Sequence, residues 1–336
     1  MNIYITLDYE LFLGNETGSV QNCLIRPMHE LCNVTNKYNV PLTIFVDAAF
    51  LLRLYESRTL CPDLQKDWNE ITQNLQEMNK LGHDIQLHFH PQWLFSTYNV
   101  EDNKWDMDYA HYKMCDIHDR SFLEECFSKS KQLLESIIGA NVFSFRAGGY
   151  CLEGIDYSSL FTNNSISIDS SVAREQYCDS KTHNYDYRYI PEKEVYGFSS
   201  DVHIEDDNKV FMELSISSIK WNMIEYLFYF HKKFKSYHPH IVYRDGTPIR
   251  DMGRANMFTK LLNKLNGITT LCSIDGPLSL FLEDYYNNAL NKRKEVLVLI
   301  GHPKNASDSS IAALGKFIEN HPNDKFLTTK AILNQR

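Results

Sequence analysis

The stretch GHDIQLHFHPQW, residues 82–93, gathers side chains that can bind a metal ion. His88 and His90 lie two positions apart, and side chains at that spacing point to the same face of a β-strand. The glycine ahead of them can end a helix, and the apolar residues that follow suit a short strand. The stretch is therefore either a histidine-rich surface loop or one half of a metal site, and the rest of the chain must decide.

Chemically capable groups also follow other strand-like segments. Asp8 and Glu10 stand in LDYE, after the first of them. Later segments end in the same way, with Arg146 in FRAGGY, Asp169 in IDSS and His302 in LIGHP. Each has an ordinary explanation when taken alone, because an acid after a strand is often a helix cap and a single histidine or arginine is often structural or solvated. Their occurrence at the same end of successive strands is rare by chance, and it predicts a functional site.

Strand-like and helical patterns alternate along the chain, which is typical of parallel strands joined by right-handed helical crossovers. We predict strands at 2–7, 41–47, 83–89, 142–150 with its loop, 165–171, 209–217 and 295–303, and a last short strand that runs into a helical turn at 324–335. Helical patterns are clearest at 26–38, 68–82 and 119–139. The chain has no glycine-rich dinucleotide fingerprint, so we expect an α/β fold built as an incomplete (β/α) barrel. In such barrels the catalytic groups lie on the loops after the strands.

Two segments break this alternation, at 174–208 and 218–256. The first is polar and aromatic, and neither continues the strand-then-helix order of its neighbours. We expect both to be insertions on the working face of a single domain that spans 1–336.

Composition and charge narrow the functional classes. The chain has 336 residues and a net charge of −9, which argues against a nucleic-acid partner, because such proteins usually carry a basic face. Its eight cysteines are scattered without a C-x-x-C pair, so we expect thiols of a reducing compartment. No signal peptide precedes the strand at Asn2, and no apolar run reaches the roughly 18 residues of a membrane span. We therefore expect a cytoplasmic protein without a transmembrane segment.

The series of strand ends resembles the motifs of the NodB-type polysaccharide deacetylases, which are carbohydrate esterases with a distorted (β/α)7 barrel and a divalent metal. TLDYE stands for the Thr-Phe-Asp-Asp motif of that family, and HFHPQW for its histidine motif. RAGGY, IDSS and LIGH follow in the family order as the Arg-x-Pro-Tyr, Asp-Ser and Leu-x-His motifs. The resemblance spans residues 3 to 303. It implies that the chain folds as a TIM-like barrel of this type and is a divergent, cytoplasmic member of the family.

The departures from the family pattern affect the metal ligands. Tyr9 replaces the second aspartate, so the resemblance implies Glu10 as the carboxylate ligand. The His-x-x-x-His spacing becomes His88 followed by Gln92, with His90 between them. Imidazole is a better zinc ligand than a glutamine amide. We therefore expect a divalent ion, zinc above all, on Glu10 and the two histidines, with Gln92 as the alternative ligand. The third motif has glycine in place of proline, which we expect to loosen its loop.

The resemblance also assigns the catalytic groups. Asp8 would be the base, Arg146 would hold it in place and ionised, and His302 would be the general acid. Asp169 would orient His302 and raise its pKa. The metal, a backbone N–H near Tyr150, or both would stabilise the oxyanion. The candidate substrate-binding residues are Tyr150, Trp93 and Ser170.

The implied reaction is removal of the acetyl group from an N-acetylated sugar, in surface polysaccharide biosynthesis. Inside a cell such sugars are met as nucleotide- or lipid-linked precursors. Arg244, Arg250 and Arg254 suit a carrier phosphate, although a solvated loop explains them more simply. The aromatic run at 221–235 suits a membrane surface, although a barrel helix explains it more simply.

Two other functional classes stay open. A glycoside hydrolase on a related seven-stranded barrel would use Asp8, Glu10 or Asp169 as its carboxylate pair. A catalytically inactive carbohydrate-binding barrel would need neither acid nor base, and the presence of both Asp8 and His302 argues against it.

Overall fold

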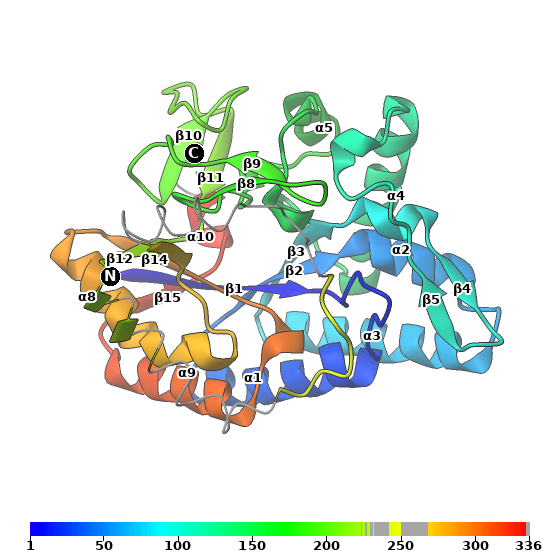
Figure 1. The fold of residues 1–336 in the computed structure, drawn as a ribbon, viewed down its shortest axis with the longest axis horizontal. Helices are drawn as coiled ribbons and strands as arrows, with labels where there is room; N and C mark the ends of the chain where they lie inside the picture. Colours follow the sequence, from blue (N-terminus) through cyan, green and yellow to red (C-terminus); the bar gives the residue numbers. More distant parts are fainter. Residues whose placement is uncertain (223, 226, 229–230, 232–241, 250–267, 334–336) are drawn as a thin grey trace.

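A computed structural model gives the fold of the chain and describes every residue except 223, 226, 229–230, 232–241, 250–267 and 334–336. Its centre is a curved, mostly parallel sheet with helices on its outer side (Figure 1). The strands follow one another across the sheet in the order β10 (Val195–Phe198), β11 (Phe211–Leu214), β7 (Ile168–Asp169), β6 (Ser144–Ala147), β3 (Asp84–Phe89), β2 (Thr43–Asp47), β1 (Asn2–Tyr9) and β14 (Val296–Gly301), with β15 (Lys325–Leu327) also paired to β1. The pair of β10 and β11 is antiparallel, and the other pairs in this sheet are parallel.

The two ends of the sheet approach each other, so that the barrel is nearly closed. Residues after other strands bridge to β14 on this side: Ser217, which follows β11, donates its backbone N–H to the Val298 carbonyl (3.1 Å), and Ser273, which follows the later strand at Ile268–Leu271, pairs with Ile300. The predicted α/β fold and the incomplete (β/α) barrel are confirmed. The predicted parallel strands are all present, each shortened or lengthened by a few residues.

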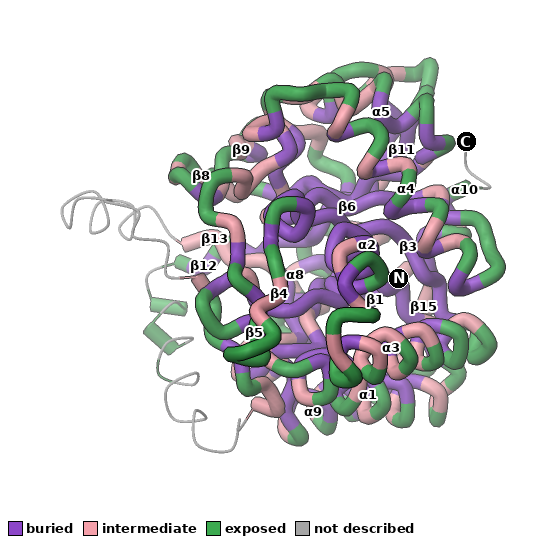
Figure 2. The backbone as a smooth tube through the Cα atoms, turned by 90° about the vertical axis from the view of Figure 1, so that its right-hand side faces the viewer, coloured by how far each residue is buried: buried purple, intermediate pink, exposed green. Residues whose placement is uncertain are grey.

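The helices cover the outside of the barrel. They are α1 (Arg26–Lys37), α2 (Ala48–Ser57), α3 (Pro62–Lys80), α4 (Arg120–Ile138), α5 (Tyr157–Asn163), α8 (Leu282–Asn291), α9 (Asp308–Asn320) and α10 (Lys330–Leu333). Helix α1 packs beside α9, and α2 and α3 pack against α4 (Figure 1). Figure 2 shows buried residues along β1, β3 and β6 and exposed residues on the outer sides of α1 and α3. The predicted helices at 26–38, 68–82 and 119–139 correspond to α1, α3 and α4.

Local signals explain where these helices begin and end. The Asp119 carboxylate accepts a hydrogen bond from the Phe122 backbone N–H, which caps the first turn of α4. Gly139 closes the same helix in a left-handed conformation (φ 67°), which a residue with a Cβ rarely adopts. The sequence therefore fixes both ends of the element that packs behind β3.

The interior of the barrel has an apolar end and a polar end. Tyr4, Ile168 and Met212 belong to a small core cluster inside the barrel. Side chains two residues further along the same strands face the same interior, and there Thr6 and Ser170 are polar. The polar end is the carboxyl end of the parallel strands, which is the end that carries the chemistry in barrels of this kind.

The two predicted insertions contain sheet elements of their own. Segment 174–208 forms the hairpin of β8 (Tyr177–Asp179) and β9 (Asn184–Asp186), and then supplies β10 to the main sheet. In the second segment, β12 (Ser218–Trp221) pairs with β13 (Ile268–Leu271). A further small hairpin, β4 (Thr97–Asn99) with β5 (Lys104–Asp106), follows β3. Much of 218–256, including Arg250 and most of the aromatic run at 221–235, lies outside the described residues.

Candidate active site

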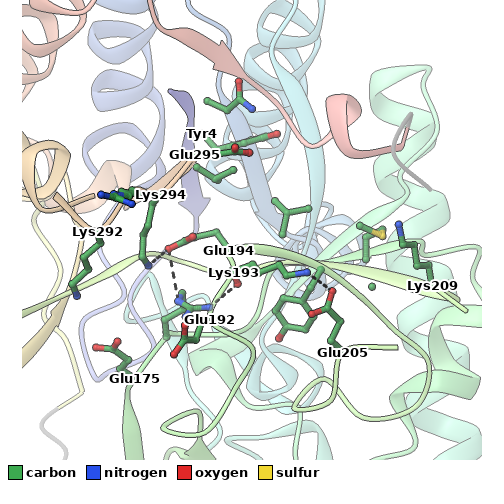
Figure 3. A pocket seen from close by; sticks show the side chains of 18 residues that line it. Tyr4, Glu175, Glu192, Lys193, Glu194, Glu205, Lys209, Lys292, Lys294 and Glu295 are labelled. Atoms are coloured by element: carbon green, nitrogen blue, oxygen red, sulfur yellow. Dashed lines mark hydrogen bonds and ion pairs between the residues drawn. The ribbon is translucent and has the colours of Figure 1, made fainter. Parts of the chain in front are cut away.

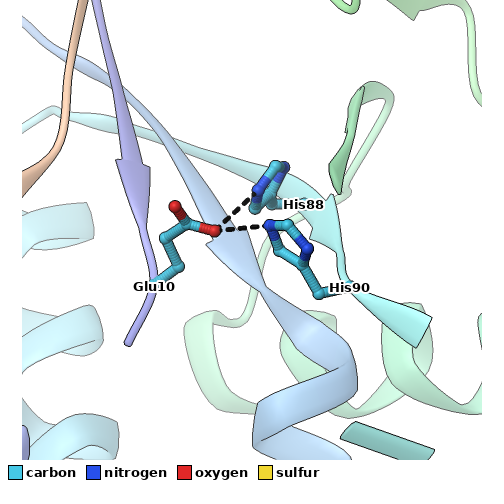
Figure 4. Close-up of side chains that lie close together, drawn as sticks. All are labelled: Glu10, His88 and His90. Atoms are coloured by element: carbon cyan, nitrogen blue, oxygen red, sulfur yellow. Dashed lines mark hydrogen bonds and ion pairs between the residues drawn. The ribbon is translucent and has the colours of Figure 1, made fainter. Parts of the chain in front are cut away.

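A carboxylate and two imidazoles meet at the carboxyl end of the barrel (Figure 4). Glu10 follows β1 directly, His88 is in β3 and His90 follows β3. Glu10 Oε2 lies 3.2 Å from His88 Nε2 and 2.5 Å from His90 Nε2. All three side chains are buried, and their donor atoms lie within 4.8 Å of one another. One oxygen and two nitrogens at this spacing match the donors of a catalytic zinc-type site.

The ring of His88 is held in the orientation that a ligand needs. Its Nδ1 lies 2.7 Å from the carbonyl oxygen of Arg146, so Nδ1 carries the proton and donates it there. Nε2 is then the ring nitrogen that faces Glu10 and is available to a cation. A backbone carbonyl in this role is a common support of metal-binding histidines. The donor set and its support therefore fit a divalent cation.

Gln92, the alternative ligand, lies in the short 3₁₀ turn Pro91–Phe95 and is buried. Its Oε1 has no hydrogen-bond partner among the described residues. It is not part of the close cluster that Glu10 forms with the two histidines. The geometry favours His90 over Gln92, as we expected from the chemistry of the ligands.

Lys304 is a neighbour of the cluster that the sequence did not indicate. Its Nζ donates to Glu10 Oε1 (2.8 Å) and to the carbonyl oxygen of Leu11 (2.9 Å). Burial alone would raise the pKa of Glu10, but the charges of Lys304 and His90 outweigh it and hold the pKa well below its ordinary value. Glu10 is therefore ionised, with Oε1 bonded to the lysine and Oε2 directed to the imidazoles.

Asp8 and Arg146 form a buried ion pair beside the cluster. Arg146 Nη1 donates to Asp8 Oδ1 (2.6 Å), and Nη2 donates to the hydroxyls of Thr6 and Ser170. Burial alone would raise the pKa of Asp8, but Arg146 and then His88 outweigh it, so that the pKa lies below its ordinary value. The predicted contact between Arg146 and Asp8 is present, and it keeps the carboxylate ionised.

His302 is oriented by Asp275, so our expectation that Asp169 does this was wrong. His302 Nδ1 lies 2.7 Å from Asp275 Oδ2, and Asp275 Oδ1 accepts the backbone N–H of His302 at 2.7 Å. The other ring nitrogen, Nε2, lies 3.7 Å from Asp8 Oδ2 and 3.8 Å from Glu10 Oε1. Burial alone would lower the pKa of His302, but Asp275 and then Asp8 raise it to about 9.

Asp169 lies on the outer face of the sheet, because it alternates with Ser170, which faces the interior. It is the register partner of Glu213 on β11, and both side chains are fully buried. Burial raises the pKa of both groups, and the charge of Asp169 is the next largest cause for Glu213. Asp169 Oδ2 and Glu213 Oε2 have no partner within the part of the chain that the structure describes. Both raised pKa values favour protonated carboxyl groups in this buried pair, which lies away from the metal donors, so we interpret the pair as structural.

The loop of the third motif packs tightly against the metal donors, which corrects the expectation that its glycines loosen it. A Cβ on Gly148 would lie 2.6 Å from His90 Nδ1, and one on Gly149 would lie 2.6 Å from the ring of His183. Gly149 and Tyr150 both have positive φ angles (59° and 64°), which only glycine adopts readily. The Tyr187 hydroxyl fixes the turn by donating to the Tyr150 carbonyl (2.7 Å). The glycines are therefore required by close approach.

Of the three expected substrate-binding residues, only Tyr150 remains a candidate. Burial, and then the charge of Asp8, raise its pKa well above the ordinary value, so its phenol is a neutral hydroxyl beside the site. Trp93 is 0 % exposed and packs against Phe50. Ser170 is also 0 % exposed and is bonded to Arg146. Both expectations were wrong because these side chains support the site from behind.

A cavity of about 860 Å³ lies at the other end of the barrel (Figure 3). Its lining includes Asn2 and Tyr4 at the beginning of β1 and Val296 at the beginning of β14. Some of the opposite charges in its lining are paired, as in Lys193 with Glu205 (2.6 Å). The cavity is therefore remote from His302 and the metal donors, which lie at the carboxyl ends of the parallel strands.

Arg244 is the one member of the predicted phosphate-binding trio that the structure describes, since Arg250 and Arg254 lie outside the described residues. Its Nη1 donates to Asn305 Oδ1 (2.9 Å), and its guanidinium lies 5.3 Å from the centroid of the Phe12 ring. Asn305 in turn donates to Asp275 Oδ2 (3.3 Å). Arg244 therefore lies near the opening of the active site, to which the side chain of Asn305 links it.

In the described part of the chain, no helix is long and apolar enough to cross a membrane.

Comparison with known proteins supports the fold. No protein-family model matches the sequence, and no curated protein matches it. Among solved structures, a protein described as a polysaccharide deacetylase from Mycobacterium smegmatis superposes with a TM-score of 0.53 at 13% identity, covering 99% of this chain and 89% of the other. The chain has the polysaccharide deacetylase fold.

The same fold is shared with another class of carbohydrate-active enzyme. GH57 branching enzymes from Thermococcus kodakaraensis and Pyrococcus horikoshii both superpose on this chain with TM-scores of 0.52 at 8% identity. Each comparison covers 99% of this chain, and 71% and 70% of the respective enzymes. The barrel alone therefore does not choose between deacetylation and glycoside chemistry, and the side chains of the site must do so.

Proposed function

We propose that this protein is a metal-dependent carbohydrate deacetylase that removes the acetyl group from an N-acetylated sugar. The observation that carries the proposal is the meeting of three groups at one end of the barrel. They are the donors Glu10, His88 and His90, the ion pair of Asp8 with Arg146, and the pair of His302 with Asp275. Amide hydrolysis needs a Lewis acid, a base and an acid, and each group supplies one of them.

A divalent cation on the three donors would supply Lewis acidity, which makes water more acidic and stabilises negative charge on the acyl oxygen. Asp8, ionised by its contact with Arg146, accepts the proton of the attacking water. The water oxygen bonds to the acyl carbon, and the C–N bond then breaks. His302 is protonated at neutral pH because its pKa is about 9, and its Nε2 proton passes to the leaving amine. The products are acetate and the free amino sugar.

The protonation states favour deacetylation over glycoside hydrolysis. A glycosidase needs one carboxyl group that is protonated near neutral pH and a second that is ionised. Asp8 and Glu10 both have lowered pKa values, so both are ionised. Asp169, the third candidate, is enclosed on the outer face of the sheet with Glu213. The acid available at the mouth is the imidazolium of His302, which suits an amine leaving group.

The surroundings of the mouth support a short substrate. The hairpin of β8 and β9 places His183 against Gly149 on one side. Residues 242–249 lie against the loop after β1, where the Thr247 N–H donates to the Glu16 carbonyl (2.9 Å). We propose a single N-acetylated sugar on a nucleotide or lipid carrier, with Arg244 near the carrier phosphate, as used in surface polysaccharide biosynthesis. All eight cysteines are free thiols, which supports a reducing, cytoplasmic setting.

The test is acetate release by protein that has been stripped with a chelator and reloaded with zinc. We expect release from N-acetylated sugar nucleotides or lipid-linked sugars only after reloading. His88→Ala should lose about one equivalent of metal, whereas the exposed His29→Ala should keep it. Release of reducing ends from an α-glucan without acetate would instead identify a glycoside hydrolase. Metal binding with neither product, on any substrate of the panel, would contradict the catalytic proposal.

A further inference from the structure

Asp47 is a buried carboxylate beside the metal donors that no step of the proposed reaction uses. It is the last residue of β2 and is 1 % exposed. It is the register partner of His88 on the neighbouring parallel strand, so both side chains point to the same side of the sheet. Burial is the largest influence on Asp47 and raises its pKa above the ordinary value, and the charges of His90 and then His88 oppose that rise.

The two oxygens of this carboxylate have different surroundings. Oδ1 accepts the backbone N–H groups of His90 (3.2 Å) and Phe50 (3.4 Å), so it caps α2 and ties the helix to the histidine motif. Oδ2 is buried and has no hydrogen-bond partner in the described part of the chain. A buried carboxylate oxygen without a partner is costly, so Oδ2 calls for a partner beyond the described residues, and a bound cation beside the two imidazoles would supply one.

The charges around the site indicate what that partner is. Arg146 is bonded to Asp8, and Lys304 is bonded to Glu10. Neither cation is left over for Asp47. At the same time Lys304 cancels the charge of Glu10, which would leave a divalent cation on this site with little negative charge to balance it. Asp47 can supply this charge when a cation binds, and its Oδ2 is an acceptor without a partner among the described residues.

We propose that Asp47 is a fourth protein group of the metal centre, with Oδ2 as the carboxylate oxygen that balances a bound divalent transition metal. This inference rests on the proposed metal-dependent function. It goes beyond that function because it adds a charged group from β2, outside the close cluster of Glu10 and the two histidines, whose charge would balance the cation. Asp47 would act on the cation while its other oxygen holds the histidine loop in place.

Asparagine at this position separates the two roles of Asp47. It retains an oxygen for the N–H groups of Phe50 and His90, and asparagine caps helices as well as aspartate does. It replaces Oδ2 by an uncharged amide nitrogen, and so removes both the negative charge and the second acceptor. Asp119→Asn is the matched control, because Asp119 caps α4 in the same manner through the Phe122 N–H and is far along the chain from the donors.

The measurement is the affinity of the stripped proteins for zinc and cobalt, by competition with a chelating dye. We expect Asp47→Asn to weaken metal binding by about 10- to 100-fold, the usual effect of removing a carboxylate that supports a metal site. Asp119→Asn should bind as the wild type does. Equal affinity in Asp47→Asn, with its fold intact by circular dichroism, would overturn the proposal.

A second variant covers the case in which Asp47→Asn does not fold. Asp47→Ser also keeps a capping oxygen, and the rise of its Tm on addition of zinc should be clearly smaller than that of Asp119→Asn; an equal rise overturns the proposal. The readout is independent of catalysis. Wild-type protein that binds zinc but releases no acetate leaves this inference standing, whereas wild-type protein that binds no divalent metal defeats it.

Discussion

Replacing Asp275 with asparagine should move the alkaline limit of activity to lower pH. Asp275 contacts His302 twice at 2.7 Å, through the ring Nδ1 and through the backbone N–H. The pKa of His302 is raised from 6.5 to about 9; burial opposes the rise, and Asp275 is the foremost group that produces it. Without that charge we expect the pKa to fall by about two units, to roughly 7.

The size of the effect follows from the fraction of His302 that carries the acidic proton. At pH 8, a group with a pKa of about 9 is about 90% protonated, and one with a pKa of about 7 is about 10% protonated. The variant should therefore lose about tenfold in kcat/KM at pH 8 and show only a small loss at pH 6, where both forms are mostly protonated. The sign is fixed, because a general acid works only in its protonated form.

The assay is the pH profile of acetate release, with Asp201→Asn as the matched control. Asp201 also bonds a histidine, with its Oδ1 lying 2.8 Å from His203 Nδ1, but on a loop that contributes no group to the site. Its profile should match that of the wild type. A loss in Asp275→Asn that is the same at every pH, or an unchanged alkaline limb, would refute the assignment of His302 as the acid under the control of Asp275.

Three further perturbations test other parts of the site. Asp8→Asn should lower kcat by about a hundredfold or more while metal content and fold are retained, and full activity would end its role as the base. Gly148→Ala should reduce metal affinity, because its Cβ would lie 2.6 Å from His90 Nδ1. Gly139→Ala is the control, because it strains the backbone at a position where no atom lies within 4 Å of the new Cβ, and it should leave metal affinity unchanged. Equal metal binding by both variants would contradict the close fit at Gly148. Glu213→Gln should remove a pH dependence of stability, since the raised pKa of Glu213 makes its contribution complete below the unfolded value of about 4.3 and lost as pH rises through the folded pKa. The free energy of unfolding of the variant, measured in urea, should therefore rise relative to that of the wild type between pH 5 and pH 8. The same difference between the two proteins at both pH values would contradict the raised pKa of Glu213.

The barrel and most of the site were predictable because they depend on local patterns. Apolar strands that alternate with helical segments leave few arrangements besides parallel strands with crossovers. Once the strands are parallel, the groups after them meet at one edge whatever their distance along the chain. This is why Glu10 and His88, which are 78 residues apart, could be assigned to one site from the sequence.

The errors arose where a side chain's partner depends on packing rather than on pattern. Asp275 follows β13 in the stretch ITTLCSIDGP, which has the same strand-then-acid signal as IDSS, but that strand was not among those predicted. Lys304 reaches Glu10 through a long side chain, and no spacing rule gives its direction. Asp169 was misassigned by a single position, because neighbouring residues of a strand face opposite sides and Ser170 is the one that faces inward.

The same alternation explains how the carboxylate ligand stands two residues after the base. In LDYE the outward position belongs to Tyr9, which is buried against α3 and donates its hydroxyl hydrogen bond to Asn74 Oδ1 (3.1 Å). Asp8 and Glu10 lie on either side of it and face the interior together, where Arg146 neutralises the first and Lys304 the second. Each acid then keeps one oxygen for chemistry, Oδ2 of Asp8 toward His302 and Oε2 of Glu10 toward the imidazoles. An aspartate at position 9 would face the helix layer, so the longer glutamate one residue on is the side chain that can supply a metal ligand here.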